Sequence, residues 1–150
     1  MGAVKVVVDT NVLVSALLFD GKPEKLIPLW QRGTIRPLAS KEIIDEYLRV
    51  FTYPKFKLTE EDVSFLLYHE ILPYFEGIDV HPGPRIIKKD PEDDKFIRCA
   101  LAGKAKLIIS GDHHLLALKT YQKIKIITPS DYLQKVVQVH AAGPHGQIQN

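Results

Sequence analysis

Short apolar runs alternate with amphipathic segments along most of the chain. Runs that are short, largely apolar and rich in β-branched residues predict strands, and they occupy residues 4–8, 34–38, 76–80, 106–109 and 123–127. Segments whose apolar residues recur at helical spacing predict helices, and they occupy residues 11–18, 24–31, 40–51, 59–71, 93–103, 112–119 and 130–139. This alternation is typical of an α/β domain around a parallel sheet. The helices clustered between residues 11 and 71 indicate a helical arm beside that sheet.

Polar residues at the ends of these segments support the predicted boundaries. Ser40, Thr59 and Ser130 each precede a helix as its N-cap, and Thr59 also begins a capping-box pattern. The last residues, 140–150, carry no core-forming pattern and are expected to be flexible. We therefore predict one domain over residues 1–139, followed by a C-terminal tail.

Composition and charge narrow the class of protein only a little. The 150 residues are 45% hydrophobic and 25% charged, with a formal net charge of +2, which favours an acidic partner weakly and does not by itself indicate nucleic acid. Cys99 is the single cysteine, which excludes an internal disulfide and a cysteine-based zinc cluster. No run approaches the roughly 20 apolar residues of a membrane span, and the N-terminus lacks a signal-peptide pattern. We expect a cytoplasmic protein that does not engage a membrane.

Acidic residues follow two of the predicted strands. Asp9 comes directly after the strand that ends at Val8, and Asp112 ends the stretch KLIISGD. In an open parallel sheet, ligands bind beyond the carboxyl ends of the strands. We therefore expect both carboxylates at this edge of the sheet, although each is also placed to cap the helix that follows it.

Two further acids lie on predicted helices that border the same edge. Asp93 and Asp94 begin a helix whose apolar arc has Asp93 near its middle, which favours Asp93 as the inward residue, although the turn DPEDD leaves an exchange with Asp94 open. Glu46 sits on the border between the apolar and the solvent arc of its helix, where it either leans over the core or stays in solvent. Carboxylates gathered in one cleft repel each other unless a cation joins them, and their hard oxygens suit Mg²⁺ or Mn²⁺.

Four stretches together resemble the PIN-domain nucleases. In chain order they are VVVDTNVLVSALL, SKEIIDEYLRV, DPEDDKFIRCALAGKA and LIISGDHHLL, and the resemblance covers about residues 4–133. It implies a three-layer α/β/α fold with a central parallel sheet and a metal-dependent ribonuclease site. Carried over to this chain, the acidic cluster of the family falls on Asp9, Glu46, Asp93 and Asp112, with Mg²⁺ or Mn²⁺ as the implied cofactor.

The resemblance also implies secondary site residues and partners. Thr10 and Asn11 match the small polar positions after the first acid, and Ser110 matches the hydroxyl residue before the last. Asp94 remains the alternative to its neighbour as third acid, and Gly111 stands where relatives often carry a basic residue. Many relatives are the toxins of toxin–antitoxin pairs, so RNA, an antitoxin protein and a second copy of the chain in a homodimer or higher homo-oligomer are the expected partners.

Cations interleaved with aromatic residues suggest where RNA would bind. The stretch EYLRVFTYPKFK carries Arg49, Lys55 and Lys57 among four aromatic residues, a pattern that suits stacking of single-stranded bases and equally suits a core helix followed by a loop. Lys88 and Lys89 precede DPEDD and either guide a phosphate backbone or lie in a solvated loop.

Histidines 113 and 114 adjoin the last acid but are expected to be exposed residues at the start of a helix, because nitrogen ligands suit Mg²⁺ poorly.

From the acidic cluster and the resemblance, we predict a Mg²⁺- or Mn²⁺-dependent endoribonuclease that cleaves single-stranded RNA. The alternative is a catalytically inactive PIN-like module that binds RNA or protein. A phosphatase of the haloacid-dehalogenase type fits less well, because its second aspartate would fall on Asn11.

Overall fold

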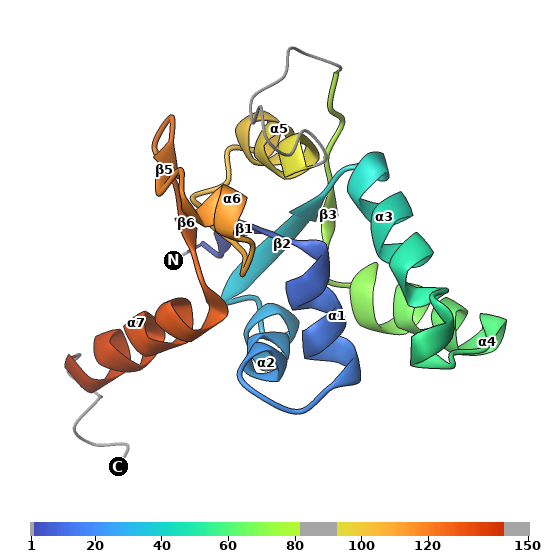
Figure 1. Cartoon of the computed structure of the whole chain (residues 1–150). Coiled ribbons are helices and arrows are strands. Elements are labelled where there is room, and N and C mark those ends of the chain that lie inside the picture. Colours follow the sequence, from blue (N-terminus) through green and yellow to red (C-terminus); the bar gives the residue numbers. More distant parts are fainter. Residues whose placement is uncertain (1, 82–92, 143–150) are drawn as a thin grey trace.

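The computed structural model describes residues 2–81 and 93–142, with side chains described as far as residue 136. Lys88, Lys89 and most of the expected tail lie outside this part of the chain. A six-stranded sheet forms the centre of the fold (Figure 1). Its strands are β1 (Val4–Val8), β2 (Ile35–Ala39), β3 (Glu76–Gly77), β4 (Leu107–Ile109), β5 (Thr120–Tyr121) and β6 (Ile124–Ile127).

The strand order is β3-β2-β1-β4-β6-β5, and every pair is parallel except β5 with β6. The two central strands are in register so that Val8 pairs with Ile109, which brings their carboxyl ends to the same place. Val6, Val7 and Val8 are fully buried, as are Ile108 and Ile109. Burial on both faces explains why these strands read as continuous apolar runs.

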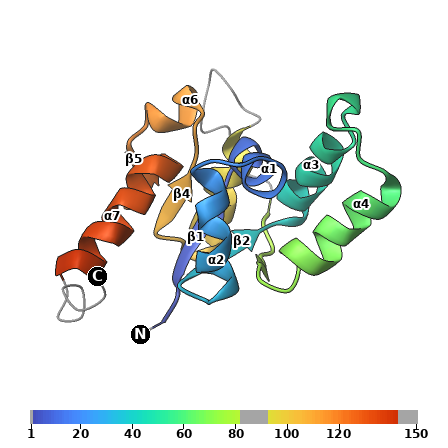
Figure 2. The ribbon, with the colours of Figure 1, turned by 90° about the horizontal axis from the view of Figure 1, so that it is seen from below.

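Helices cover both faces of this sheet, as the two views show (Figures 1 and 2). The helices are α1 (Thr10–Leu18), α2 (Leu26–Gln31), α3 (Lys41–Phe51), α4 (Glu60–Phe65), α5 (Asp94–Gly103), α6 (His113–Leu116) and α7 (Pro129–Ala142). Helices α1 and α2 lie on one face, and α5 packs on the other against β1, β2 and β4. The result is the three-layer α/β/α architecture expected from the sequence.

The predicted helical arm lies beside the sheet. Helix α3 contacts α1 and is followed by the short 3₁₀ helix η2 (Pro54–Phe56) and by α4. The capping box at Thr59 forms with Asp62, as the pattern predicted. The helix then departs from the prediction, because Leu66–Ile71 (η3) is a π-helix rather than a continuation of α4.

Three predicted boundaries near the C-terminus and the sheet edge are wrong. The strand expected over 76–80 is only Glu76–Gly77, and the helix expected over 112–119 ends at Leu116. The last helix begins at Pro129, one residue before the expected cap, because the Thr128 hydroxyl accepts the backbone N–H of Asp131 at 3.1 Å. Proline suits the first helical position, where its missing N–H costs nothing.

The antiparallel hairpin of β5 and β6 was not predicted. Tyr121 pairs with Ile124 across a two-residue turn in which Gln122 and Lys123 both have positive φ, 47° and 72°. Such turns normally carry Asn or Gly at these positions, so Gln-Lys gave no signal. Within the residues described, no helix combines the length and the apolar character needed to cross a membrane.

Candidate active site

Asp9 lies immediately beyond the end of β1, at the centre of the sheet edge. Its backbone N–H continues the sheet by donating to the Ile109 carbonyl at 3.1 Å. Its side chain caps α1, because Oδ1 accepts the Val12 N–H at 2.9 Å. The residue is only 4% exposed. Asp9 is thus both a helix cap and a carboxylate fixed in the rigid part of the molecule, so the two interpretations of this residue are compatible.

Ser110 connects Asp9 with the second strand-end acid. Its hydroxyl donates to Asp9 Oδ2 and accepts the Asp112 N–H at 2.9 Å. Asp112 in turn caps α6 through Oδ1, which accepts the N–H groups of His114 and Leu115 at 2.8 and 3.2 Å. The cap uses one carboxylate oxygen, Oδ1, for both bonds. The sequence SGD therefore ties the ends of β1 and β4 together through one buried hydroxyl group.

The structure separates the two adjacent acids at the start of α5. Asp93 occupies the N-cap position and lies in the lining of a cavity at the sheet edge. Asp94 is 1% exposed and forms an ion pair with Arg98, whose Nη2 lies 3.6 Å from Asp94 Oδ2. Asp93 is therefore the residue that α5 presents to the other acids, as the helical arc favoured.

Glu46 reaches the same cavity from α3 and is held by side chains. The Thr10 hydroxyl donates to Glu46 Oε2, and Lys95 Nζ lies 2.5 Å from Glu46 Oε1. Arg49 Nη2 lies 3.6 Å from the same oxygen. The side chains of Glu46 and Lys95 are 15% and 6% exposed. Two cations and a hydroxyl therefore fix a carboxylate that lies on the border of its helix.

Sequence reasoning did not include Lys95 in the site. A lysine after two aspartates at a helix start looks like an ordinary solvated residue. The helical position of Lys95 could have indicated that its side chain faces inward. Lys95 precedes Phe96 and lies one helical turn before Cys99, and both of these side chains are buried.

Burial changes the protonation chemistry at the centre of the site. Desolvation raises the pKa of Asp9 from 3.8 to about 6, and the charge of Asp112 adds to the rise. Hydrogen bonds from Ser110, Val12 and Gly111 favour the carboxylate and limit the shift. Nearby, the buried Tyr47 hydroxyl donates to the Val8 carbonyl at 2.5 Å, and burial keeps the pKa of Tyr47 well above its ordinary value. Tyr47 therefore remains a neutral donor that anchors α3 to the end of β1.

A cavity of roughly 260 Å³ joins these groups. All four predicted acids line it, together with Thr10, Asn11, Arg49, Val50, Tyr53, Lys55, Phe56 and Phe96. Apart from Phe96 of α5, the aromatic and cationic residues lie between the end of α3 and η2, so the stretch singled out in the sequence reaches the acidic cluster. Lys57 follows η2 in a left-handed conformation, with φ of 54°, and is absent from the residues that line this cavity in the described part of the chain.

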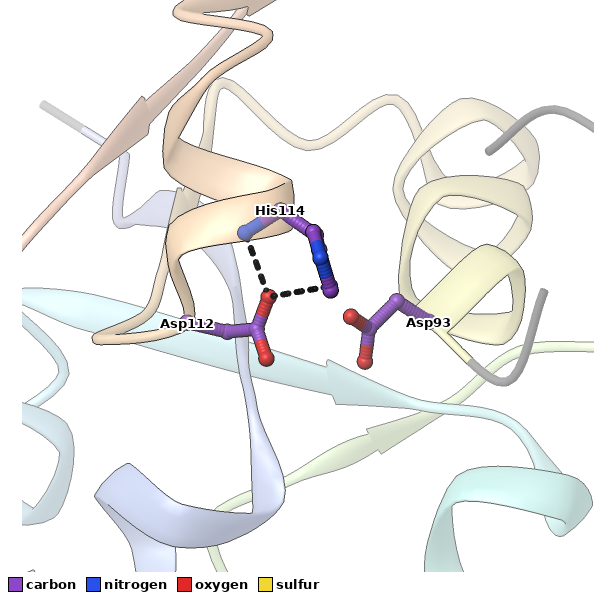
Figure 3. A group of neighbouring side chains, drawn as sticks. All are labelled: Asp93, Asp112 and His114. Carbon is purple, nitrogen blue, oxygen red and sulfur yellow. Dashed lines mark hydrogen bonds and ion pairs between the residues drawn. The ribbon is translucent and has the colours of Figure 1, made fainter. Parts of the chain in front are cut away.

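Asp93, Asp112 and His114 point toward one another from the starts of α5 and α6 (Figure 3). One ligand atom from each lies within 4.8 Å of the others. His113 is exposed, as expected from the sequence, but His114 is half-buried. Carboxylate oxygens at this spacing fit a divalent cation, so Asp93 and Asp112, with Asp9 at the same edge, are the residues that would hold one.

Comparison with known proteins identifies the family. Residues 5–114 match the PIN domain. The chain is also 31% identical over 144 residues to "Uncharacterized protein MJ1680" of Methanocaldococcus jannaschii, a match that covers 88% of this chain and 91% of that protein. The chain therefore belongs to the PIN-domain family, whose members are generally nucleases, a class of hydrolase. PIN nucleases typically use divalent metals, which agrees with the donor set at the sheet edge.

Proposed function

We propose that this protein is a Mg²⁺- or Mn²⁺-dependent endoribonuclease that cleaves phosphodiester bonds of single-stranded RNA. The observation that carries the proposal is the convergence of Asp9, Glu46, Asp93 and Asp112 on one cavity whose rim carries cations and aromatic rings. Acids alone are common at helix starts. Acids that share a cavity with phosphate-binding and base-stacking side chains suit a nuclease.

The residues at the sheet edge would have different roles in cleavage. Asp9, Asp93 and Asp112 would hold the cation, which when bound activates water and neutralises charge on the phosphate. Glu46 is oriented by Thr10, Lys95 and Arg49, and it would either complete the ligand set or accept a proton from the attacking water. The buried hydroxyl of Ser110 keeps the first and last acids at a fixed separation.

The rim of the cavity supports single-stranded RNA as the substrate. Arg49 and Lys55 supply positive charge for the phosphate backbone, and Tyr53 is 41% exposed beside them. An exposed ring at the edge of a cationic cleft can stack on an unpaired base. A base in a duplex is already stacked on its neighbours, so this arrangement favours unpaired RNA.

The test is cleavage of a mixed single-stranded RNA pool by the wild type and Asp9→Asn. We expect cleavage with Mg²⁺ or Mn²⁺, and loss of cleavage both in EDTA and in the variant. RNA binding without cleavage under either metal would contradict the proposal and would support the PIN-like binding module instead. A fold check by circular dichroism separates lost chemistry from lost structure.

We also propose that the protein acts as the toxin of a toxin–antitoxin pair and forms a homodimer or higher homo-oligomer. Family membership supports this proposal, and so does the exposure of Phe65, Tyr68 and Leu72 along α4 and η3, where a partner chain would cover them. Expression in a bacterial host should arrest growth for the wild type but not for Asp9→Asn. Light scattering on the purified protein should give more than one chain per particle, and a monomer would contradict the second part.

A further inference from the structure

His114 brings a nitrogen atom into an otherwise oxygen-rich site. Its side chain reaches toward Asp93 and Asp112, and one ligand atom of each of the three lies within 4.8 Å of the others (Figure 3). Donor atoms about 2.1 Å from one ion in octahedral geometry lie roughly 3–4.2 Å apart. The observed spacing therefore needs only small side-chain movements to close around a cation.

The cap of α6 places the imidazole of His114 beside Asp112. Asp112 Oδ1 accepts the backbone N–H of His114 at 2.8 Å, and His114 Nδ1 lies 3.9 Å from the same oxygen. The backbone bond holds the start of α6 over the carboxylate, and the ring of His114 lies beside Asp93 and Asp112 (Figure 3). The His114 side chain is 31% exposed, which leaves a path for an ion from solvent.

The neighbouring histidine provides an internal contrast. His113 packs its ring against His114, with ring centroids 4.2 Å apart, yet it is exposed and lies outside the group of three potential ligands in the described residues. The two residues are adjacent and chemically identical, and they differ in whether the ring approaches the carboxylates.

We propose that His114 is a metal ligand together with Asp93 and Asp112, and that this nitrogen makes the site prefer Mn²⁺ over Mg²⁺. The inference rests on the proposed metal-dependent function. Mg²⁺ takes oxygen ligands almost exclusively. Mn²⁺ belongs to the transition-metal series whose affinity for sites with nitrogen donors begins at Mn²⁺ and rises through Fe²⁺, Co²⁺ and Ni²⁺, so Mn²⁺ accepts imidazole more readily than Mg²⁺ does. Exchange of one oxygen donor for nitrogen therefore penalises Mg²⁺ more than Mn²⁺.

The experiment uses Mn²⁺ alone as the probe on metal-free full-length protein. Electron paramagnetic resonance measures how much Mn²⁺ is bound, and electron spin-echo modulation reports whether nitrogen coordinates it. We expect nitrogen modulation in the wild type and in His113→Ala, and its loss in His114→Ala. We also expect His114→Ala to weaken Mn²⁺ binding at least tenfold, with a smaller loss for Mg²⁺ measured by competition.

Each outcome separates this inference from the function on which it rests. Bound Mn²⁺ without nitrogen modulation in the wild type would overturn the role of His114 and leave a metal nuclease with oxygen ligands alone. Failure of the wild type to bind Mn²⁺ or Mg²⁺ at all would overturn both. Nitrogen modulation that persists in His114→Ala would also overturn the assignment, and His114→Gln repeats the test with a side chain of similar size.

Discussion

The acids at the strand ends and the acid on the helical arm are held in different ways. Asp9 and Asp112 follow the central strands, and backbone N–H groups and one buried hydroxyl fix their carboxylates. Glu46 projects from α3, and charged side chains fix it instead. A carboxylate bound to backbone cannot move unless the sheet edge moves, whereas one bound to a lysine and an arginine depends on two long side chains. Among these three acids, the fold therefore holds Asp9 and Asp112 as a rigid pair and Glu46 as an adjustable acid.

The largest expected effect is on the rate of RNA cleavage. Substitution of Asp9, which is held by the backbone, should lower this rate more than substitution of Glu46, which is held by side chains. Asp9→Asn should reduce the rate at least about a hundredfold, because it removes a charge from the rigid centre of the proposed metal site. Glu46→Gln should cost less, about tenfold, because the amide retains the shape of the side chain and its oxygen still accepts from Lys95, while its nitrogen can donate to the Thr10 hydroxyl. Single-turnover cleavage under saturating Mn²⁺ measures both. A Glu46→Gln rate equal to that of the wild type would remove Glu46 from the mechanism.

The pH dependence of stability tests the burial of the rigid acid. The pKa of Asp9 is raised from 3.8 to about 6 in the folded state, so between these values the folded protein keeps a proton that the unfolded chain has lost. Stability from this group is fully present below pH 3.8 and is lost as the pH rises through 6. The loss amounts to about 3 kcal/mol.

Urea unfolding of the metal-free wild type and of Asp9→Asn at pH 4, 5, 6, 7 and 8 isolates this contribution. The wild type should become progressively less stable relative to the variant as the pH rises, and the difference should level off above pH 7. A difference that stays constant across the series would mean that the Asp9 carboxylate titrates normally. Chelator is needed throughout, because a bound cation would favour the charged carboxylate.

Removal of the buried cation tests how the adjustable acid is held. Lys95→Met should destabilise the protein by about 2 kcal/mol, because it leaves the carboxylate of Glu46 in a largely buried place with weaker compensation. Urea unfolding at pH 7 measures the change. Lys41→Met is the matched control, since Lys41 forms an ion pair of 2.9 Å with Asp45 in full solvent. Equal stability of the two variants would mean that the Lys95–Glu46 pair behaves as a surface pair.

The same contrast explains how much of the molecule could be predicted from its sequence. The strand-end acids were predictable because Asp9 and Asp112 follow short apolar runs, and topology alone brings the carboxyl ends of parallel strands together. The inward position of Asp93 followed from the helical arc on which Phe96 and Ile97 lie. These features depend on backbone geometry and periodicity, which a single sequence expresses directly.

Contacts between side chains from distant elements were not predictable in this way. The pairing of Lys95 with Glu46 joins α5 to α3 across 49 positions of sequence, and periodicity carries no information about such a pair. His114 was assigned to solvent because imidazole suits Mg²⁺ poorly, an argument about the ion rather than about geometry. The hairpin at Gln122 and Lys123 was missed for a third reason, since those residues adopt a turn conformation that their side chains disfavour.

The smallest expected effect concerns the second cation near Glu46. Arg49 is 61% exposed and lies 3.6 Å from the carboxylate, so Arg49→Gln should change the free energy of unfolding by no more than about 0.5 kcal/mol.

The charge of Arg49 faces the cavity, so the same variant should weaken RNA binding. It should also reduce the slope of log affinity against log salt by about 0.7 if one phosphate contact is lost. Arg36→Gln provides the control, because Arg36 is similarly exposed and pairs with Glu76 at 3.9 Å outside the cavity. Both arginine variants also carry Asp9→Asn, so that the RNA is not cleaved during the measurement. Filter binding of a single-stranded RNA at several salt concentrations then gives the slope for each protein. A normal slope together with a large loss of stability would assign Arg49 to the support of Glu46 and leave Lys55 as the phosphate contact.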